Sequence, residues 1–201
     1  MLGPLTNTIQ GVVNFTWPML IISIVIMVSV RITYIIKNKT RFVLYKELLM
    51  LVFAIYILCL FQVVTFQDSM AQYGNNFIPF HEIFRYNITS RLFLKNVIGN
   101  MIMFFPFGFF ISYYINPDDI KPILILTLIA SIAIEIVQLL IGRVFDIDDI
   151  LLNLVGGALG YAIYNIMRKI GEKFPKVFHN ELLLNISSIT ALMGLFALLI
   201  L

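Results

Sequence analysis

Six long apolar runs constrain this chain more than any other feature of its sequence. A helix that crosses a bilayer needs about 20 mostly apolar residues, because roughly 30 Å of hydrocarbon is crossed at about 1.5 Å per residue. The runs are 18 to 21 residues long and occupy positions 16–36, 48–66, 97–115, 123–142, 150–167 and 182–201. They are continuously apolar, whereas barrel strands alternate over about ten residues. We therefore predict an all-α, polytopic integral membrane protein with about six transmembrane helices.

The composition supports this fold class and excludes others. Hydrophobic residues make up 60% of the 201 residues and charged residues 12%, with a mean hydropathy of +0.95. Soluble domains carry about twice that share of charged residues. The net charge of +3 is too small and too dispersed to indicate a nucleic-acid partner. The partner that this composition requires is the lipid bilayer.

The distribution of basic residues predicts the orientation. Lys and Arg collect in cytoplasmic loops. With the amino terminus outside, ten of the fourteen basic residues fall on the inner side, and the opposite orientation inverts this ratio. We therefore predict an N-out/C-out topology. Four basic residues then lie outside, accompanied by six of the eleven acidic residues, so polar chemistry of both signs is expected at the outer face.

Glu135 is an acidic residue inside a predicted span, roughly 10 Å below its outer end by helical rise. A charge within the bilayer costs on the order of 3 kcal/mol and usually faces a cavity or a partner. Gln138 lies three residues further on and shares the helical face. Two interpretations stay open. Glu135 belongs to an outward-facing site, or it is protonated and only forms a structural hydrogen bond to Gln138 or a neighbouring helix.

Two other predicted spans carry matching polar faces in their outer halves. Asn96 and Asn100 are four residues apart at the start of one predicted helix, and Asp149 and Asn153 are four apart at the start of another. Residues at this spacing share a face of a helix. These side chains either line a common site or form hydrogen bonds that hold helices together.

Three acids and an arginine stand between the fourth and fifth predicted spans. Asp146, Asp148 and Asp149 follow Arg143 closely, and such a group could ligate a divalent cation, pair with the arginine, or cap the next helix. We favour capping or ion pairing for Asp146 and Asp148. Asp149 is expected to point inward, because it is in register with Asn153. No metal site is predicted.

Gly156 and Gly160 continue this polar face of the fifth predicted span. Their spacing is the small-x-x-x-small pattern that lets two membrane helices approach closely. We expect them to serve helix packing. The chain contains no nucleophile elbow, phosphate loop, zinc-protease helix or dinucleotide fingerprint, so the sequence predicts no cofactor and leaves open whether any reaction is catalysed.

An ordered set of motifs resembles the VanZ-like family. The motifs are Asn76-Phe77-Ile78-Pro79-Phe80, Asn96-x-x-x-Asn100, Phe105-Pro106-Phe107-Gly108, Glu135-x-x-Gln138, Arg143-x-x-Asp146-x-Asp148-Asp149, Asn153, and Gly156-Gly157-x-x-Gly160. The resemblance covers residues 48–167. It implies three segments: an additional N-terminal transmembrane helix with a basic cytoplasmic loop (1–47), the VanZ-like core (48–167), and a basic loop with a C-terminal helix (168–201).

The resemblance also implies a setting and a shared site. It indicates a multi-pass protein of the bacterial cytoplasmic membrane, related to one associated with resistance to teicoplanin-type glycopeptides. The partners it implies are a lipid-linked envelope precursor or the glycopeptide antibiotic itself. The residues carried over as a shared polar site are Asn96, Asn100, Glu135, Gln138, Arg143, Asp146, Asp149 and Asn153. The alternative is a non-catalytic structural or partner-binding membrane factor, in which the polar cluster only holds the helices together.

Overall fold

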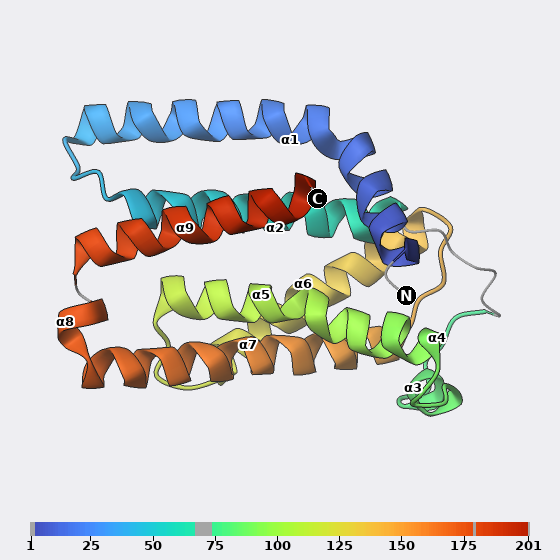
Figure 1. The fold of residues 1–201 in the computed structure, drawn as a ribbon. Coiled ribbons are helices and arrows are strands. Elements are labelled where there is room, and N and C mark those ends of the chain that lie inside the picture. Colours follow the sequence, from blue (N-terminus) through green and yellow to red (C-terminus); the bar gives the residue numbers. More distant parts are fainter. Residues whose placement is uncertain (1–2, 67–73, 179, 201) are drawn as a thin grey trace. The chain divides into compact units, whose positions relative to one another are not determined.

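A computed structural model describes residues 3–66, 74–178 and 180–200, and the side chains of residues 3–16, 20, 64–66, 82, 177–178, 192 and 194–200 lie outside the description. The described chain is helical (Figure 1). The elements are α1 (Gly3–Asn38), α2 (Leu44–Phe66), α3 (His81–Arg85), α4 (Arg91–Phe93), the π-helical turn η1 (Leu94–Ile98), α5 (Gly99–Ile115), α6 (Lys121–Leu140), α7 (Ile147–Lys173), α8 (Pro175–Phe178) and α9 (Glu181–Ile200).

Five helical segments among the described residues are long and apolar enough to cross a membrane. They are Trp17–Asn38, Leu44–Val63, Arg91–Ile115, Lys121–Leu140 and Ile147–Lys173. These segments coincide with the first five predicted spans, which confirms the all-α, polytopic membrane fold. The sixth predicted span, 182–201, coincides with helix α9, whose last side chains fall outside the described residues. The N-out/C-out orientation stays a prediction.

The chain divides into two compact units, and the first contains residues 1–59 and 168–201. Within it, Arg31 of α1 donates two hydrogen bonds to the carboxylate of Glu47 on α2, at 2.7 and 2.9 Å. The backbone N–H of Tyr45 on α2 donates to Oδ1 of Asn185 on α9, at 2.9 Å. Charged and amide groups therefore tie α1 and α9 to α2, where a paired arginine costs less to hold among apolar residues than a lone one.

The second unit, residues 60–167, has its core between α5, α6 and α7. Helices α5 and α7 approach backbone to backbone at glycines. A Cβ atom added to Gly156 would lie 2.2 Å from the carbonyl oxygen of Met101, and one added to Gly160 would lie 2.2 Å from that of Phe105. No side chain fits at such distances. The predicted packing role of these two glycines is confirmed.

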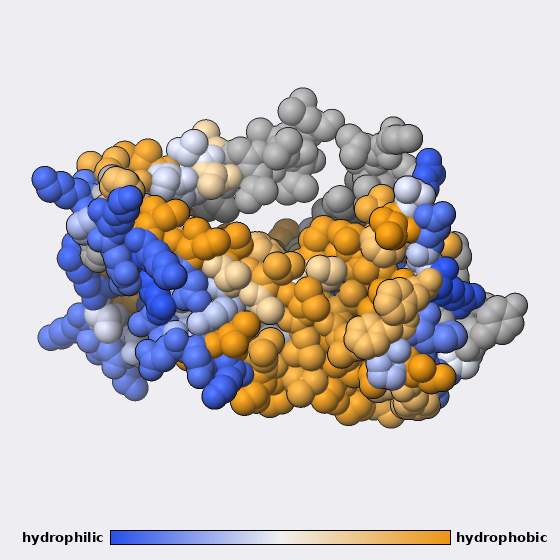
Figure 2. All heavy atoms as spheres, turned by 90° about the horizontal axis from the view of Figure 1, so that it is seen from below, coloured by the Kyte–Doolittle hydropathy of each residue, from blue (hydrophilic) through white to orange (hydrophobic). Residues whose placement is uncertain are grey.

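Helix α6 is amphipathic, with its polar face toward the other helices and its apolar face toward the outside of the bundle. Thr127, Ser131, Glu135 and Gln138 are buried. The opposite side exposes large aliphatic residues such as Ile129, which is 60% exposed. Figure 2 shows one face of the molecule, where an apolar band lies between hydrophilic ends. Lipid-facing apolar side chains and a buried polar stripe are typical of a membrane helix that supports an internal site.

Candidate functional site

Two connecting segments far apart in the sequence are joined at one end of the second unit. Asn76 forms an isolated parallel bridge with Asp146. The Asn76 N–H donates to the carbonyl of Phe145 at 2.8 Å, and the Ile147 N–H donates to the carbonyl of Asn76 at 3.1 Å. The Asn76 side chain also donates to Oδ1 of Asp146, at 2.8 Å. The segment before α3 is thereby fixed to the turn that precedes α7.

Asp146 and Asp148 use their carboxylates to shape this end of the unit. Oδ1 of Asp146 accepts from the Asp148 N–H at 2.9 Å, so Asp146 caps α7, as the sequence predicts. Asp148 is only 1% exposed, and its two oxygens accept from the backbone N–H groups of Phe80 and Ile83. Asp148 therefore holds the short helix α3 against the bundle, a role that the sequence interpretation missed.

Glu135 is connected to Arg143 through Gln138. Glu135 is 1% exposed, and its Oε2 accepts from the Asp146 N–H at 2.9 Å. The amide orientation of Gln138 that satisfies both of its neighbours donates to Glu135 Oε1 at 3.0 Å and accepts from Arg143 Nη1 at 3.1 Å. The buried acid thus supports the turn before α7 and, through one amide, orients the arginine.

The predicted polar faces of α5 and α7 meet. Asn100 on α5, whose side chain is partly buried, donates a hydrogen bond to Oδ1 of Asp149 on α7. Asn153, one turn further along α7, donates to Oγ of Ser131 on α6 at 2.9 Å, and its own Oδ1 is buried with no hydrogen-bond partner. Asn100 and Asp149 face each other at the end of the bundle, whereas Asn153 lies deeper and joins α7 to α6.

A small polar pocket lies where these groups converge. Its volume is about 70 Å³. Since one water needs roughly 10–15 Å³ of such space, the pocket has room for a few waters or a small polar group. The lining residues are Ile83, Tyr86, Lys95, Asn96, Val97, Asn100, Arg143, Asp146, Asp148, Asp149 and Leu152.

Five of the eight residues in the predicted site line this pocket: Asn96, Asn100, Arg143, Asp146 and Asp149. The others stand behind it. Glu135 and Gln138 are hydrogen-bonded to residues that line it, and Asn153 bonds to Ser131. The structure therefore brings the predicted residues into one neighbourhood, and their functional role stays a prediction.

Sequence reasoning left Lys95, Tyr86 and Asp148 out of the site. Lys95 had a signal, because it precedes Asn96 and is one of four basic residues expected on the outer side. It lies in the π-helical turn η1, a type of irregularity that is frequent at functional sites. Tyr86 had no signal in the sequence, since it enters the lining only because α3 is folded back.

The pocket combines two cations with carboxylates that already accept hydrogen bonds. Lys95 and Arg143 are suited to a phosphate or a carboxylate, which accepts charge-assisted hydrogen bonds from both. The side-chain amides of Asn96 and Asn100 can add neutral hydrogen bonds. Among the residues that the structure describes, no group of three His, Cys, Asp or Glu side chains is arranged to hold a metal ion.

Membrane-length helices with inward polar residues, which meet beside a small polar pocket, define a class: a multi-pass helical membrane protein with an internal polar site. Residues 47–168 match the family model described as VanZ/LLP1, and the chain belongs to this family. Protein VanZ of Enterococcus faecium is 34% identical over 77 residues. That match covers 37% of this chain and 47% of the VanZ protein, so it spans about half of the relative's length. No solved structure matches the chain.

Proposed function

We propose that this VanZ-like protein acts at the outer face of the bacterial cytoplasmic membrane. There, its pocket binds a small anionic group in the headgroup of a lipid-linked envelope component, and this binding lowers the binding of teicoplanin-type glycopeptides at the cell surface. The observation that carries the proposal is the pocket itself, in which Lys95 and Arg143 stand beside the amides of Asn96 and Asn100. The three aspartates of the lining already accept hydrogen bonds from the protein, which leaves the two cations and the amides as the donors for a ligand. The family's association with glycopeptide resistance supplies the biological setting.

The proposed division of labour follows from the hydrogen bonds. Arg143 holds an anionic group of the ligand, and Gln138 keeps the guanidinium in place through its own bond to Glu135. Asn100 and Asp149 form the opposite wall, and their hydrogen bond orients both side chains toward the pocket. In this proposal Glu135 is a positioning residue. No reaction is assigned to the site.

The test is expression in a glycopeptide-sensitive bacterial host, with antibiotic susceptibility and fluorescent teicoplanin binding at the cell surface as readouts. We expect Glu135→Gln and Asp149→Asn to abolish the protection given by the wild-type chain. Each change keeps the shape of the side chain but removes an acceptor that the network uses. Asp118→Asn is the matched control, because Asp118 is exposed in the α5–α6 connection. Full protection by both variants at normal membrane levels contradicts the proposal.

A second candidate function is a structural membrane factor whose polar groups only hold helices together. The hydrogen bonds from Asn153 to Ser131 and from Asn100 to Asp149 join separate helices and favour this alternative. Thermal unfolding of the detergent-purified variants separates the two candidates. A strongly lowered melting temperature supports the structural role, whereas unchanged melting with lost protection supports a binding site.

A further inference from the structure

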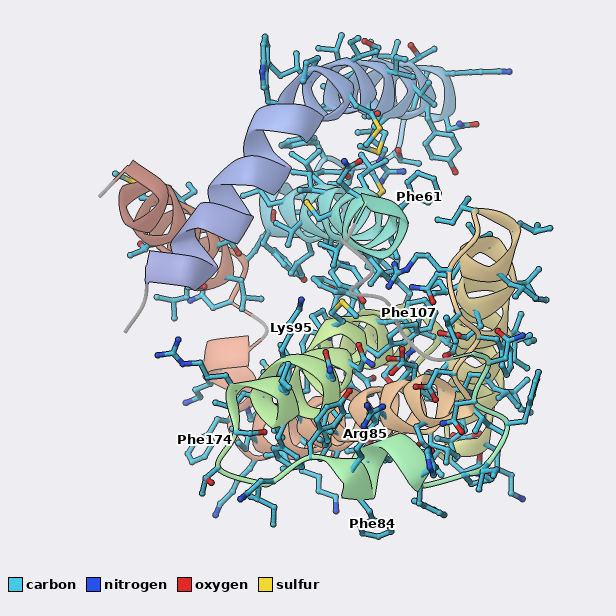
Figure 3. The ribbon with its side chains drawn as sticks, turned by 90° about the vertical axis from the view of Figure 1, so that its right-hand side faces the viewer. Phe61, Phe84, Arg85, Lys95, Phe107 and Phe174 are labelled. Atoms are coloured by element: carbon cyan, nitrogen blue, oxygen red, sulfur yellow. The ribbon has the colours of Figure 1, made fainter. Side chains whose placement is uncertain are left out.

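The segment from Phe77 to Leu94 exposes an unusual series of large apolar side chains. Their exposed fractions lie between 49% for Leu92 and 81% for Phe84. The members of this series are Phe77, Ile78, Phe80, Phe84, Ile88, Leu92 and Leu94. Figure 3 looks onto this end of the molecule and shows Phe84 pointing away from helices α5 to α7.

The exposure of these side chains is built into the fold. The bridge from Asn76 to Asp146 fixes the start of the segment. The hydrogen bonds from the backbone of Phe80 and Ile83 to Asp148 fix α3. A series of exposed apolar side chains on a segment held in place by hydrogen bonds indicates an apolar partner. Residues 77–90 lie between two candidate membrane-spanning segments in the chain, α2 and Arg91–Ile115, and residues 91–94 begin the second of these. The lipid of the bilayer is therefore the apolar partner nearest to this segment.

The charges of the same segment identify which layer of the bilayer it fits. Residues 74–95 contain three basic residues, Arg85, Arg91 and Lys95, against one acid, Glu82. Arg91 and Lys95 are exposed and stand beside the exposed Leu92 and Leu94. Apolar side chains next to cations are typical of segments that lie in the membrane interface, where phosphates meet the acyl chains.

We infer that residues 77–94 form an interfacial segment that inserts Phe84 and its apolar neighbours into the outer leaflet and binds anionic phospholipid through its basic residues. Ile83 and Tyr86 of this segment, and Lys95 at its end, line the polar pocket. The pocket therefore opens at the depth of the lipid phosphates, and a headgroup reaches it sideways from the leaflet. This last step rests on the proposed function, whereas the insertion of the segment does not.

The experiment uses the full chain in nanodiscs of phosphatidylcholine and phosphatidylglycerol, with a single tryptophan as a depth probe. Trp17 is the chain's one tryptophan, so Trp17→Phe gives a silent background. Phe84→Trp reports on the segment, and Ile88→Trp, at a position 75% exposed, repeats the measurement. Ile129→Trp in the middle of α6 is the deep control, and Asp118→Trp is the water-facing control.

We expect bromine atoms near the headgroup end of the acyl chains to quench Phe84→Trp about twofold more than bromine atoms near the methyl end. An interfacial side chain lies only ~5–10 Å into the boundary. Ile129→Trp should show the reverse order. Quenching of Phe84→Trp and Ile88→Trp by aqueous iodide, to the level of Asp118→Trp, overturns the insertion.

Lipid preference is tested with the bromine label on one lipid at a time. Brominated phosphatidylglycerol should quench Phe84→Trp more than the same fraction of brominated phosphatidylcholine, and Arg91→Gln should reduce the difference. Equal quenching by the two lipids overturns the anionic preference. Neither readout involves the antibiotic, so failure here is distinguishable from failure of the proposed function. Asp118→Asn, at an exposed position in the α5–α6 connection, should leave both readouts unchanged.

Discussion

Asp148 shows how a single buried carboxylate can organise a site without occupying its centre. Its oxygens accept from the backbone of Phe80 and Ile83, and its own N–H donates to Asp146. A buried carboxylate is stable only when its lone pairs are matched by donors. Here the donors come from a segment about 65 residues away in the chain, so the same bonds that satisfy Asp148 also position Tyr86 in the pocket lining.

Asp148→Ala should lower the free energy of unfolding by about 1–3 kcal/mol, because two backbone N–H groups lose their acceptors. Hydrogen exchange at the amides of Phe80 and Ile83 should accelerate, while exchange in the middle of α6 stays slow. SDS-induced unfolding and exchange mass spectrometry measure the two effects. Asp118→Ala is the control, and equal protection of α3 in both variants would show that Asp148 does not hold this helix.

At the scale of elements, the pocket depends on how closely α5 and α7 approach. Gly108 and Gly157 face each other at the contact, where a Cβ on Gly108 would lie 2.1 Å from the carbonyl oxygen of Gly157. This contact brings Asn100 on α5 within hydrogen-bonding reach of Asp149 on α7. The small residues thus act on the site indirectly, because they set the separation of the two helices that form its walls.

Gly156→Ala should destabilise the protein strongly. The added methyl group would meet the backbone of Met101, which cannot move aside as a flexible side chain can. Gly99→Ala is the matched control, because its nearest neighbour, the carbonyl oxygen of Leu94, would be an ordinary 3.7 Å away. Alanine is the better helix former by about 1 kcal/mol, so Gly99→Ala should melt at or above the wild-type temperature. Similar melting of the two variants would remove the role assigned to the glycine contact.

At the scale of the whole molecule, the proposed function depends on which side of the membrane the pocket faces. The pocket-lining residues come from the α3–η1 region, the start of α5, the turn before α7 and the first turns of α7, which meet at one end of the second unit. The distribution of basic residues predicts that this end is outside the cell. The α5–α6 connection, which contains Asp118, should then lie in the cytoplasm.

Cysteine labelling tests this orientation. In a Cys59→Ser background, Thr89→Cys should react with a membrane-impermeant maleimide on intact spheroplasts. Asp118→Cys should react only after the membrane is opened. Both positions are exposed, and Cys59 is the one native cysteine, so the background is free of other thiols. The reverse pattern of labelling would place the pocket in the cytoplasm and would end the proposal of an action on surface-exposed envelope components.

Local sequence features predicted the polar faces but not all of their partners. The four-residue spacing of Asn96 and Asn100 predicted a shared face, and both side chains line the pocket, although Asn96 lies in the π-helical turn η1 and Asn100 on α5. The same spacing paired Asp149 with Asn153, yet Asn153 bonds to Ser131 on α6. Periodicity states which residues share a face of one helix. It does not state which neighbouring helix each side chain meets, and here Asp149 bonds to Asn100 on α5 whereas Asn153 bonds to α6.

The sequence by itself determined the membrane-spanning helices and the close glycine contact. Both follow from local rules, since a bilayer selects continuous apolar runs and a close helix crossing selects small residues. Only the tertiary structure decided that Asn76, 70 residues before Asp146, would bridge to it, and that Asp148 would hold α3 and bring Tyr86 to the pocket. Such contacts depend on how the loops return over the bundle. Local propensities and residue spacings do not predict this path, because the bonds join residues that are far apart in the sequence and come together only when the chain folds.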